Sequence, residues 1–213
     1  MSHIFRSHSL RFLAVLILCQ FFLAPSVQAS VQIQIGQNFS GSDNTSTLIT
    51  PADSNGAIGP QHFVEFINGA FAIYNTTNGA LISRIGDDQF WANAGVTIAS
   101  DNSVSDPRII YDPTVQRWFA SQVDFNVFVP DSTALANDFL LAISDTADPA
   151  GSWHGAAFTA DPKTSFFADF PTLGVDAKAV YLSGDMFSSG SPVGCTIWSL
   201  PKADLLLNEI PAV

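Results

Sequence analysis

Short apolar runs alternate with turn-forming residues along most of the chain. Residues 62–67 and 70–74 are two such runs, and between them lies Asn68-Gly69. This pair is a strong hairpin signal, because both central positions of the tightest hairpin turn need positive φ. A third run, residues 80–85, follows another Asn- and Gly-rich turn. The pattern predicts a meander of three antiparallel strands.

The next region repeats this pattern with four runs. Residues 108–111 lead into an Asp112-Pro113 turn, residues 117–124 run back, and residues 138–144 and 153–159 follow. Four strands in about 50 residues is close to the size of one β-propeller blade. The region therefore predicts a four-stranded antiparallel sheet.

A weaker copy of the same design comes later in the chain. Residues 170–176 echo residues 106–112, and residues 179–183 echo the strand after Arg117. We therefore predict an all-β fold of antiparallel four-stranded blades in a partial β-propeller, residues 59–213. Its units are predicted at about residues 59–100, 101–160 and 161–213. The incomplete last unit suggests a truncated chain.

The segment before the first meander is polar and rich in turn formers. Residues 31–35, Val-Gln-Ile-Gln-Ile, alternate strictly and predict one strand. Residues 37–59 carry many Asn, Ser, Thr, Gly and Asp residues and predict a long loop. Residues 30–58 are therefore expected to form an N-terminal strand and a polar loop.

The N-terminus has the pattern of a secretory signal peptide. Arg6 and Arg11 precede an apolar run over residues 12–24, and Val27 and Ala29 occupy the small positions of a cleavage site. A membrane anchor would need roughly 20 apolar residues. We therefore predict cleavage after Ala29, giving a secreted or periplasmic protein with no membrane insertion after signal cleavage.

Composition narrows the range of partners. The chain has 8 basic and 19 acidic residues, a net charge of −11. Binding to nucleic acid through phosphate neutralisation is excluded by this balance. Cys195 is the one cysteine after residue 29, so no internal disulfide is expected. We interpret Cys195 as a small core residue within an apolar strand.

The turn before the fourth strand of the central unit carries a motif. Thr146, Asp148, Ser152 and Trp153 fall at the spacings of the Asp-box, Ser/Thr-x-Asp-x-Gly-x-Thr-Trp, with Gly151 one position late. Here the chain resembles sialidase-like (BNR-like) β-propellers, in which the box is structural. The resemblance implies that Asp148 caps amides of this turn while Trp153 packs beneath it.

Other pieces are similar to those of secreted bacterial proteins with β-propeller domains of unassigned activity. They are Asp-Pro-Arg-x-x-Tyr-Asp-Pro, Arg-Trp-Phe and Asp-Phe-Pro-Thr-Leu-Gly-Val-Asp, and the resemblance covers roughly residues 59–201. It implies a fold but no activity, because propellers host many functions.

Sialidase chemistry is disfavoured by the residues themselves. It needs three converging arginines, a Tyr–Glu pair and an acid Asp. Only Arg84, Arg108 and Arg117 remain after the signal peptide, and each lies at a different strand end or turn. No nucleophile elbow or phosphate loop occurs either. We therefore predict no catalytic and no cofactor-binding residue.

Aspartate-rich turns leave a calcium site open. Asp supplies the hard oxygen ligands that Ca²⁺ prefers. The alternative is that each Asp caps a turn. The candidate ligands are Asp101, Asp106, Asp112, Asp169 and Asp176.

Two functions remain open. The first is an exported, non-enzymatic binding or scaffold module whose partner is an extracellular protein or polysaccharide. The alternative is a fragment of a secreted glycan-active hydrolase whose catalytic residues lie in missing blades. The tryptophans fit either a carbohydrate platform or the blade core.

Overall fold

The computed structural model describes residues 31–129 and 131–207. The chain divides into two units, up to Gly36 and from Gln37 onward. The predicted signal peptide, residues 1–29, lies outside the described residues. In the first unit residues 31–35 form no strand, so that prediction was wrong. An alternating pattern makes a strand only where a neighbour pairs with its backbone.

The second unit begins with a four-stranded sheet. Its strands follow chain order, β1-β2-β3-β4. They are β1 (Asn55–Ile58), β2 (His62–Ile67), β3 (Ala70–Asn75) and β4 (Leu81–Ile85). The predicted meander is confirmed as β2 to β4. The predicted loop before it, however, contains β1 and a short helix, α2 (Asn44–Thr47).

A second four-stranded sheet and a three-stranded sheet follow. The second sheet has the order β5-β6-β7-β8 and the third the order β11-β10-β9, all antiparallel. The second comprises β5 (Asn102–Asp112), β6 (Arg117–Asn126), β7 (Asp138–Ser144) and β8 (Trp153–Thr159). The third comprises β9 (Phe167–Val175), β10 (Ala179–Ser188) and β11 (Ser191–Pro201).

Three short helices connect or end these sheets. They are α3 (Asp87–Asn93), the 3₁₀ turn η2 (Ser132–Ala134) and α4 (Lys202–Leu206). Among the described residues no helix is long and apolar enough to cross a membrane.

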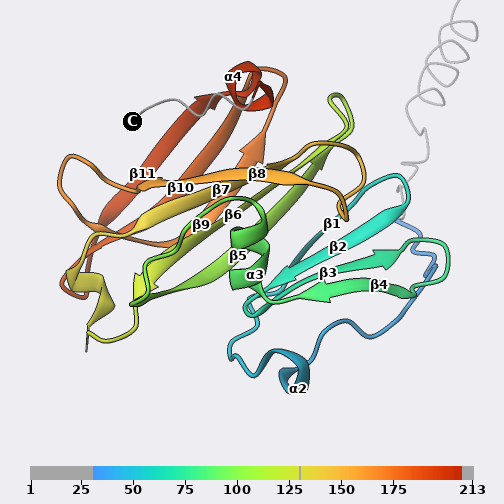
Figure 1. Cartoon of the computed structure of the whole chain (residues 1–213), viewed down its shortest axis with the longest axis horizontal. Helices are drawn as coiled ribbons and strands as arrows, with labels where there is room; N and C mark the ends of the chain where they lie inside the picture. Colours follow the sequence, from blue (N-terminus) through green and yellow to red (C-terminus); the bar gives the residue numbers. More distant parts are fainter. Residues whose placement is uncertain (1–30, 130, 208–213) are drawn as a thin grey trace, which may run out of the picture. The chain divides into compact units, whose positions relative to one another are not determined.

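The first strands of the three sheets are neighbours. β1 and β2 contact β5, and β5, β6 and β7 contact β9, so the second sheet packs between the other two (Figure 1). Successive antiparallel sheets that meet along their first strands are blades of a β-propeller. The fold class predicted from the sequence, all-β with antiparallel blades of a partial β-propeller, is confirmed.

Two hydrophobic clusters fill the spaces on either side of the second sheet. Trp118 and Ala120 of β6 join Phe66 and Trp91 in the first cluster, and Phe119 joins the second. Because successive strand residues point to opposite faces, β6 is buried on both sides. Burying each large apolar side chain stabilises the fold by about 1.5–3 kcal/mol. β6 is therefore the centre of the core.

Candidate functional site

The innermost strands of all three sheets carry a residue in the left-handed backbone conformation at the same place. Asp53, just before β1, has φ 44°, Asp106 in β5 has φ 60°, and Phe170 in β9 has φ 47°. The β5–β6 and β9–β10 pairings shift register beside Asp106 and Phe170. Such a backbone costs a non-glycine residue roughly 1–3 kcal/mol and is concentrated at functional sites.

Hydrogen bonds join these three positions. The Phe170 amide donates to Asp106 Oδ2 at 3.1 Å, and the Asp106 amide donates to Asn68 Oδ1 at 2.9 Å. Asn68 Nδ2 in turn donates to Asp53 Oδ2 at 2.7 Å. The chain of bonds thus runs from the first sheet through the second to the third. We call Asp53, Asn68, Asp106, Arg108 and Phe170 the inner-strand cluster.

The ionisation of Asp53 depends on the neighbouring Asp106. Burial raises the pKa of Asp53, and a hydrogen bond with Asp106 and the charge of Asp106 raise it further. The Asn68 side chain and the Arg108 charge oppose this rise. Carboxyl groups with a shared environment and an altered pKa are frequent at functional sites.

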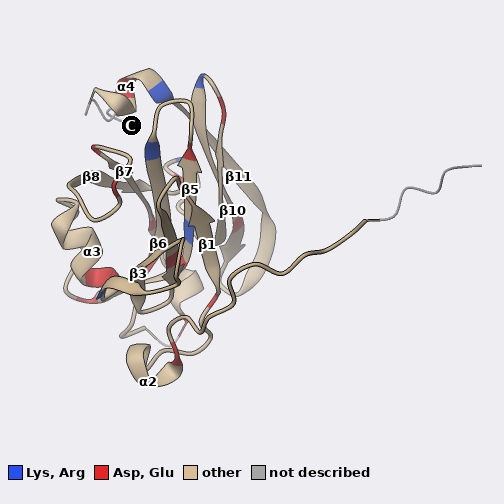
Figure 2. Cartoon of the chain, turned by 90° about the vertical axis from the view of Figure 1, so that its right-hand side faces the viewer, with Lys and Arg blue, Asp and Glu red and all other residues tan. Residues whose placement is uncertain are grey.

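An exposed aromatic ring and a guanidinium group complete the cluster. The Phe170 residue is 56% exposed, and Arg108 Cζ lies 4.6 Å from its ring centroid, a cation–π contact. Arg108 Nη1 also donates to the Pro107 carbonyl at 2.8 Å. Basic positions are few and acidic ones many (Figure 2). The cluster therefore brings together one half-buried carboxyl, Asp53, the Arg108 donors and an exposed aromatic residue.

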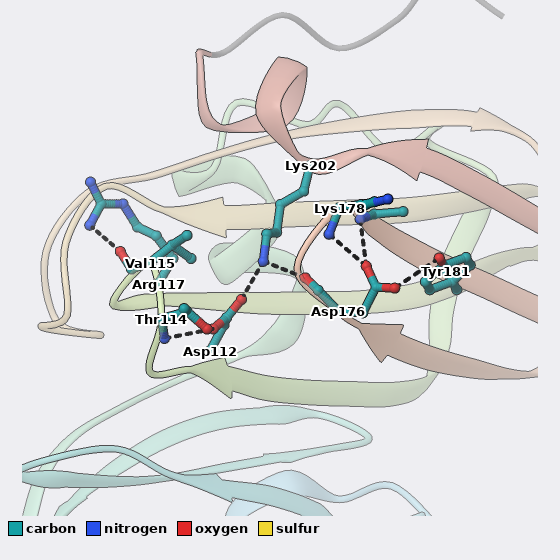
Figure 3. A network of polar contacts seen from close by, with 9 residues as sticks. Asp112, Thr114, Val115, Arg117, Asp176, Lys178, Tyr181 and Lys202 are labelled. Atoms are coloured by element: carbon teal, nitrogen blue, oxygen red, sulfur yellow. Dashed lines mark hydrogen bonds and ion pairs between the residues drawn. The ribbon is translucent and has the colours of Figure 1, made fainter.

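Two of the predicted calcium ligands lie instead around an internal ammonium group. Lys202 Nζ is 2.7 Å from Asp112 Oδ2 and also donates to the Asp176 carbonyl (Figure 3). Burial alone would raise the pKa of Asp112, but hydrogen bonds from Lys202 and Thr114 outweigh it and lower that pKa. The cation beside Asp112 is thus the ammonium group of Lys202.

The other candidate ligands are dispersed. The Asp176 carboxylate caps its own turn, accepting from the Lys178 and Ala179 amides at 2.7 and 2.8 Å (Figure 3). Asp169 lies opposite Asp185 in the β9–β10 pairing, and Asp101 precedes β5. Within residues 31–129 and 131–207 no three or more His, Cys, Asp or Glu side chains gather to hold a metal. A calcium site stays a prediction.

The Asp-box-like turn joins β7 to β8. Asp148 Oδ1 accepts from the Ala150 amide at 3.0 Å, and the Asp148 amide donates to Thr146 Oγ1 at 3.2 Å. The Gly151 amide donates to the Asp148 carbonyl, and the turn continues through Ser152. The Trp153 indole donates to the Pro149 carbonyl at 2.9 Å, and its ring contacts Phe71 and Phe90. These contacts hold the turn in place.

The other tryptophan, histidine and cysteine residues considered above lie outside the inner-strand cluster. The Trp91 and Trp118 residues are fully buried, and their indoles donate to Gln122 and to the Ala147 carbonyl. His154 lies between Asp145 and the Leu205 carbonyl. Cys195 is exposed, so its interpretation as a core residue was wrong. It lies on β11, which among the described strands has β10 as its one neighbour.

Most of the inner-strand cluster was missed by the sequence reasoning. Asp106 was named, but as a calcium ligand, and Arg108 was noted only as the start of a strand. The echo of residues 106–112 in 170–176 held the signal, because both copies place a proline after the left-handed residue. The third position, Asp53, is followed by Ser54 and not by proline, so the echo does not reach it.

Comparisons with known proteins give little beyond the fold. No family model matches the chain. No curated protein matches either. An α-L-arabinofuranosidase from Lactobacillus brevis aligns over 72% of this chain and 51% of its own, with TM-score 0.45 and 14% identity. An exo-β-1,3-galactanase from Phanerochaete chrysosporium, solved with β-1,3-galactotriose, aligns over 71% and 39%, with TM-score 0.41 and 13% identity.

This chain thus spans at most about half of either enzyme. Likenesses of this degree carry no argument about substrate, and the kinship with sialidase-like repeats stays a prediction.

Proposed function

We propose that this protein is an exported polysaccharide-binding module and that the inner-strand cluster holds the sugar. The observation that carries the proposal is Phe170. The residue is more than half exposed, its backbone is in the left-handed region, and its ring lies against Arg108. Folding alone favours neither an exposed ring nor a left-handed phenylalanine, so a gain in binding is the better explanation.

The chemistry of the cluster suits a sugar ring. A pyranose presents a C–H face that packs on an aromatic ring and a rim of hydroxyl groups that form hydrogen bonds. Phe170 supplies the ring, the half-buried Asp53 carboxyl supplies an acceptor, and the planar Arg108 guanidinium supplies donors, while the buried Asp106 holds the Phe170 backbone. A protein partner would demand a larger apolar surface than this cluster presents.

A glycan array and calorimetric titration of extracellular polysaccharides test this function. We expect Phe170→Ala to weaken binding at least tenfold, because the packing of the sugar on the ring and the Arg108 contact are both lost. Phe128→Ala is the matched control, since Phe128 is a 75% exposed ring outside the cluster and should bind as the wild type does. No binding to any polysaccharide, or equal loss in both variants, contradicts the proposal.

The second candidate is glycan hydrolysis at the same carboxyl groups. The raised pKa of Asp53 favours it, because a general acid must hold its proton near the working pH. The burial of Asp106 opposes it, because Asp106 is 7% exposed and its Oδ2 already accepts from the Phe170 amide, whereas a glycosidase needs a second carboxyl that reaches substrate or water. If the protein releases reducing sugar from a polysaccharide and Asp53→Asn abolishes that release, the protein is a hydrolase. If it binds the polysaccharide without releasing sugar, the result supports the binding module.

Export is part of the proposal, because polysaccharides of this kind lie outside the cell. The basic residues, apolar run and cleavage pattern of residues 1–29 support it. We expect the protein in the periplasm or medium to begin at Ser30. N-terminal sequencing of the recovered protein checks this, and a retained Met1 would contradict it.

A further inference from the structure

β11 is an open edge with an apolar stripe. Within residues 31–129 and 131–207 it pairs with β10 alone, and its sheet has three strands where the other two have four. Cys195 and Ile197 alternate along it and are exposed, Ile197 to 71%, and the exposed Val193 lies at a break in the β10–β11 register. Its prolines, Pro192 and Pro201, lie at the two ends, so the strand between them keeps its hydrogen-bonding groups. Such an edge is a template for another strand.

Residues 31–35 have the complementary pattern. Val31, Ile33 and Ile35 are 90%, 86% and 79% exposed and alternate with Gln32 and Gln34. In an extended backbone these three apolar side chains share one face. Three aliphatic side chains exposed on one face are unfavourable in water. The segment therefore buries apolar surface if it adds as a strand to a sheet whose edge strand has apolar side chains on the same face.

The other outer edges fit this segment less well. On β4 the exposed apolar residues are Leu81 and Ile82, which are adjacent and so point to opposite faces. On β8 the exposed positions are Ala157 and Thr159, which offer little apolar area. Only β11, among these edges of the described sheets, presents apolar side chains at alternate positions.

The attachment of residues 37–42 to the first sheet opposes the pairing within one chain. Gln37 Nε2 donates to the Thr77 carbonyl at 3.2 Å, Phe39 packs on Tyr74 with ring centroids 5.2 Å apart, and Ser42 bonds Glu65. These contacts hold residues 37–42 on the first sheet. Ile35 then lies within roughly 7 Å of Gln37. The third sheet lies beyond the second, about 20 Å away at usual sheet spacing.

We propose that residues 31–35 add as a strand to β11 of a second copy of this chain. The pairing converts the three-stranded sheet into a four-stranded one, like its two neighbours. If each copy donates its segment to the other, the assembly is a closed two-fold dimer. The partner is thus another copy of the protein, recognised by main-chain hydrogen bonds and by the aliphatic stripe.

Disulfide trapping gives a direct test, because Cys195 lies on the proposed interface. In a Cys19→Ser background, Val31, Ile33 and Ile35 are each replaced by Cys, with Gln32→Cys and Gln34→Cys as matched controls on the opposite face. After mild oxidation we expect a covalent dimer from at least one of the first three variants and from neither control. A disulfide within one chain, or equal trapping in all five variants, overturns the proposal.

The mass in solution provides a second readout that needs no cysteine. We expect the wild type to be dimeric by light scattering at micromolar concentration, and Ile197→Lys to be monomeric because a charge on the edge opposes pairing. Leu207→Lys, at a site of similar exposure on the C-terminal side of α4, should remain dimeric. A monomeric wild type, or a dimeric Ile197→Lys protein, overturns the proposal, and circular dichroism confirms folding in each case.

Discussion

Among single residues, Asp112 and Lys202 form an ion pair with almost no contact with solvent. Their side chains are 8% and 4% exposed. The pair links the β5–β6 turn of the second sheet to the end of β11 in the third, and the Asp176 carbonyl joins it (Figure 3). Because both charges are desolvated, each depends on the other for its compensation.

Removing one partner of this pair should therefore destabilise the protein strongly. We expect Lys202→Met to lower the free energy of unfolding by about 3–5 kcal/mol, because it leaves the Asp112 carboxylate buried and uncompensated. Lys178→Met, at an exposed position nearby, should change it by less than about 0.5 kcal/mol. Urea unfolding measures both. The double variant Lys202→Met/Asp112→Leu should recover part of the loss, and no recovery would contradict the desolvation argument.

Asp53 differs from Asp112, because ionisation of the Asp53 carboxyl should lower the free energy of unfolding. Its pKa is raised by burial and by Asp106, so the folded state holds the proton to higher pH than the unfolded state. The stability contributed by this group falls as pH rises from the unfolded value, about 3.9, through the folded one. Asp53→Asn should thus gain stability relative to the wild type between pH 3 and pH 7.

Urea midpoints at the two pH values measure that gain. Asp185→Asn, at an exposed strand position, serves as the control variant. A stability difference between Asp53→Asn and the wild type that stays constant with pH would show that Asp53 does not titrate in this way.

At the level of strands, most of the fold could be predicted from short apolar runs and turn residues. β2, β3 and β4 were found because Asn68-Gly69 and the later Asn- and Gly-rich turn separate clear runs. β1 was missed because Asn55-Gly-Ala-Ile58 has low strand propensity and is made a strand by pairing with β2. For residues 31–35 the error was the opposite one: their alternation predicts a strand, but no described strand pairs with them.

The candidate site was harder to foresee than the strands. Its residues come from four separate segments that meet only once the three sheets are packed. Composition and spacing alone say that an Asp caps a turn, but not that Asn68 links Asp53 to Asp106. Cys195 shows the same limit. Its apolar strand predicts a core position from sequence, and only the pairing of the described strands shows that β11 lies at the outer edge of its sheet.

The left-handed position in β9 can be tested by comparing two small residues. Phe170→Gly relieves the strained backbone, whereas Phe170→Ala keeps it, and both remove the ring. We expect the glycine variant to be more stable than the alanine variant by about 1 kcal/mol, from chemical unfolding. If the alanine variant is equally stable, φ at this position is not a source of strain.

Taken together, the three sheets form a gradient of stability across the second unit. β6 and β7 are buried on both faces, while β4 and β11 are open on one edge and largely exposed. Amides of buried central strands exchange hydrogen only on global unfolding, whereas those of exposed edges exchange through local opening. The order in which strands open should therefore follow their distance from β6.

Hydrogen exchange monitored by mass spectrometry tests this order and its dependence on association. In dilute protein we expect peptides from β6 and β7 to exchange last, and those from β4 and β11 to exchange earlier by orders of magnitude. Raising the concentration should slow exchange in β11 and residues 31–35 together, because strand addition protects both partners, and should leave β4 unchanged. The Ile197→Lys variant should lose this dependence. Equal slowing in β4 would mean that association uses a different surface.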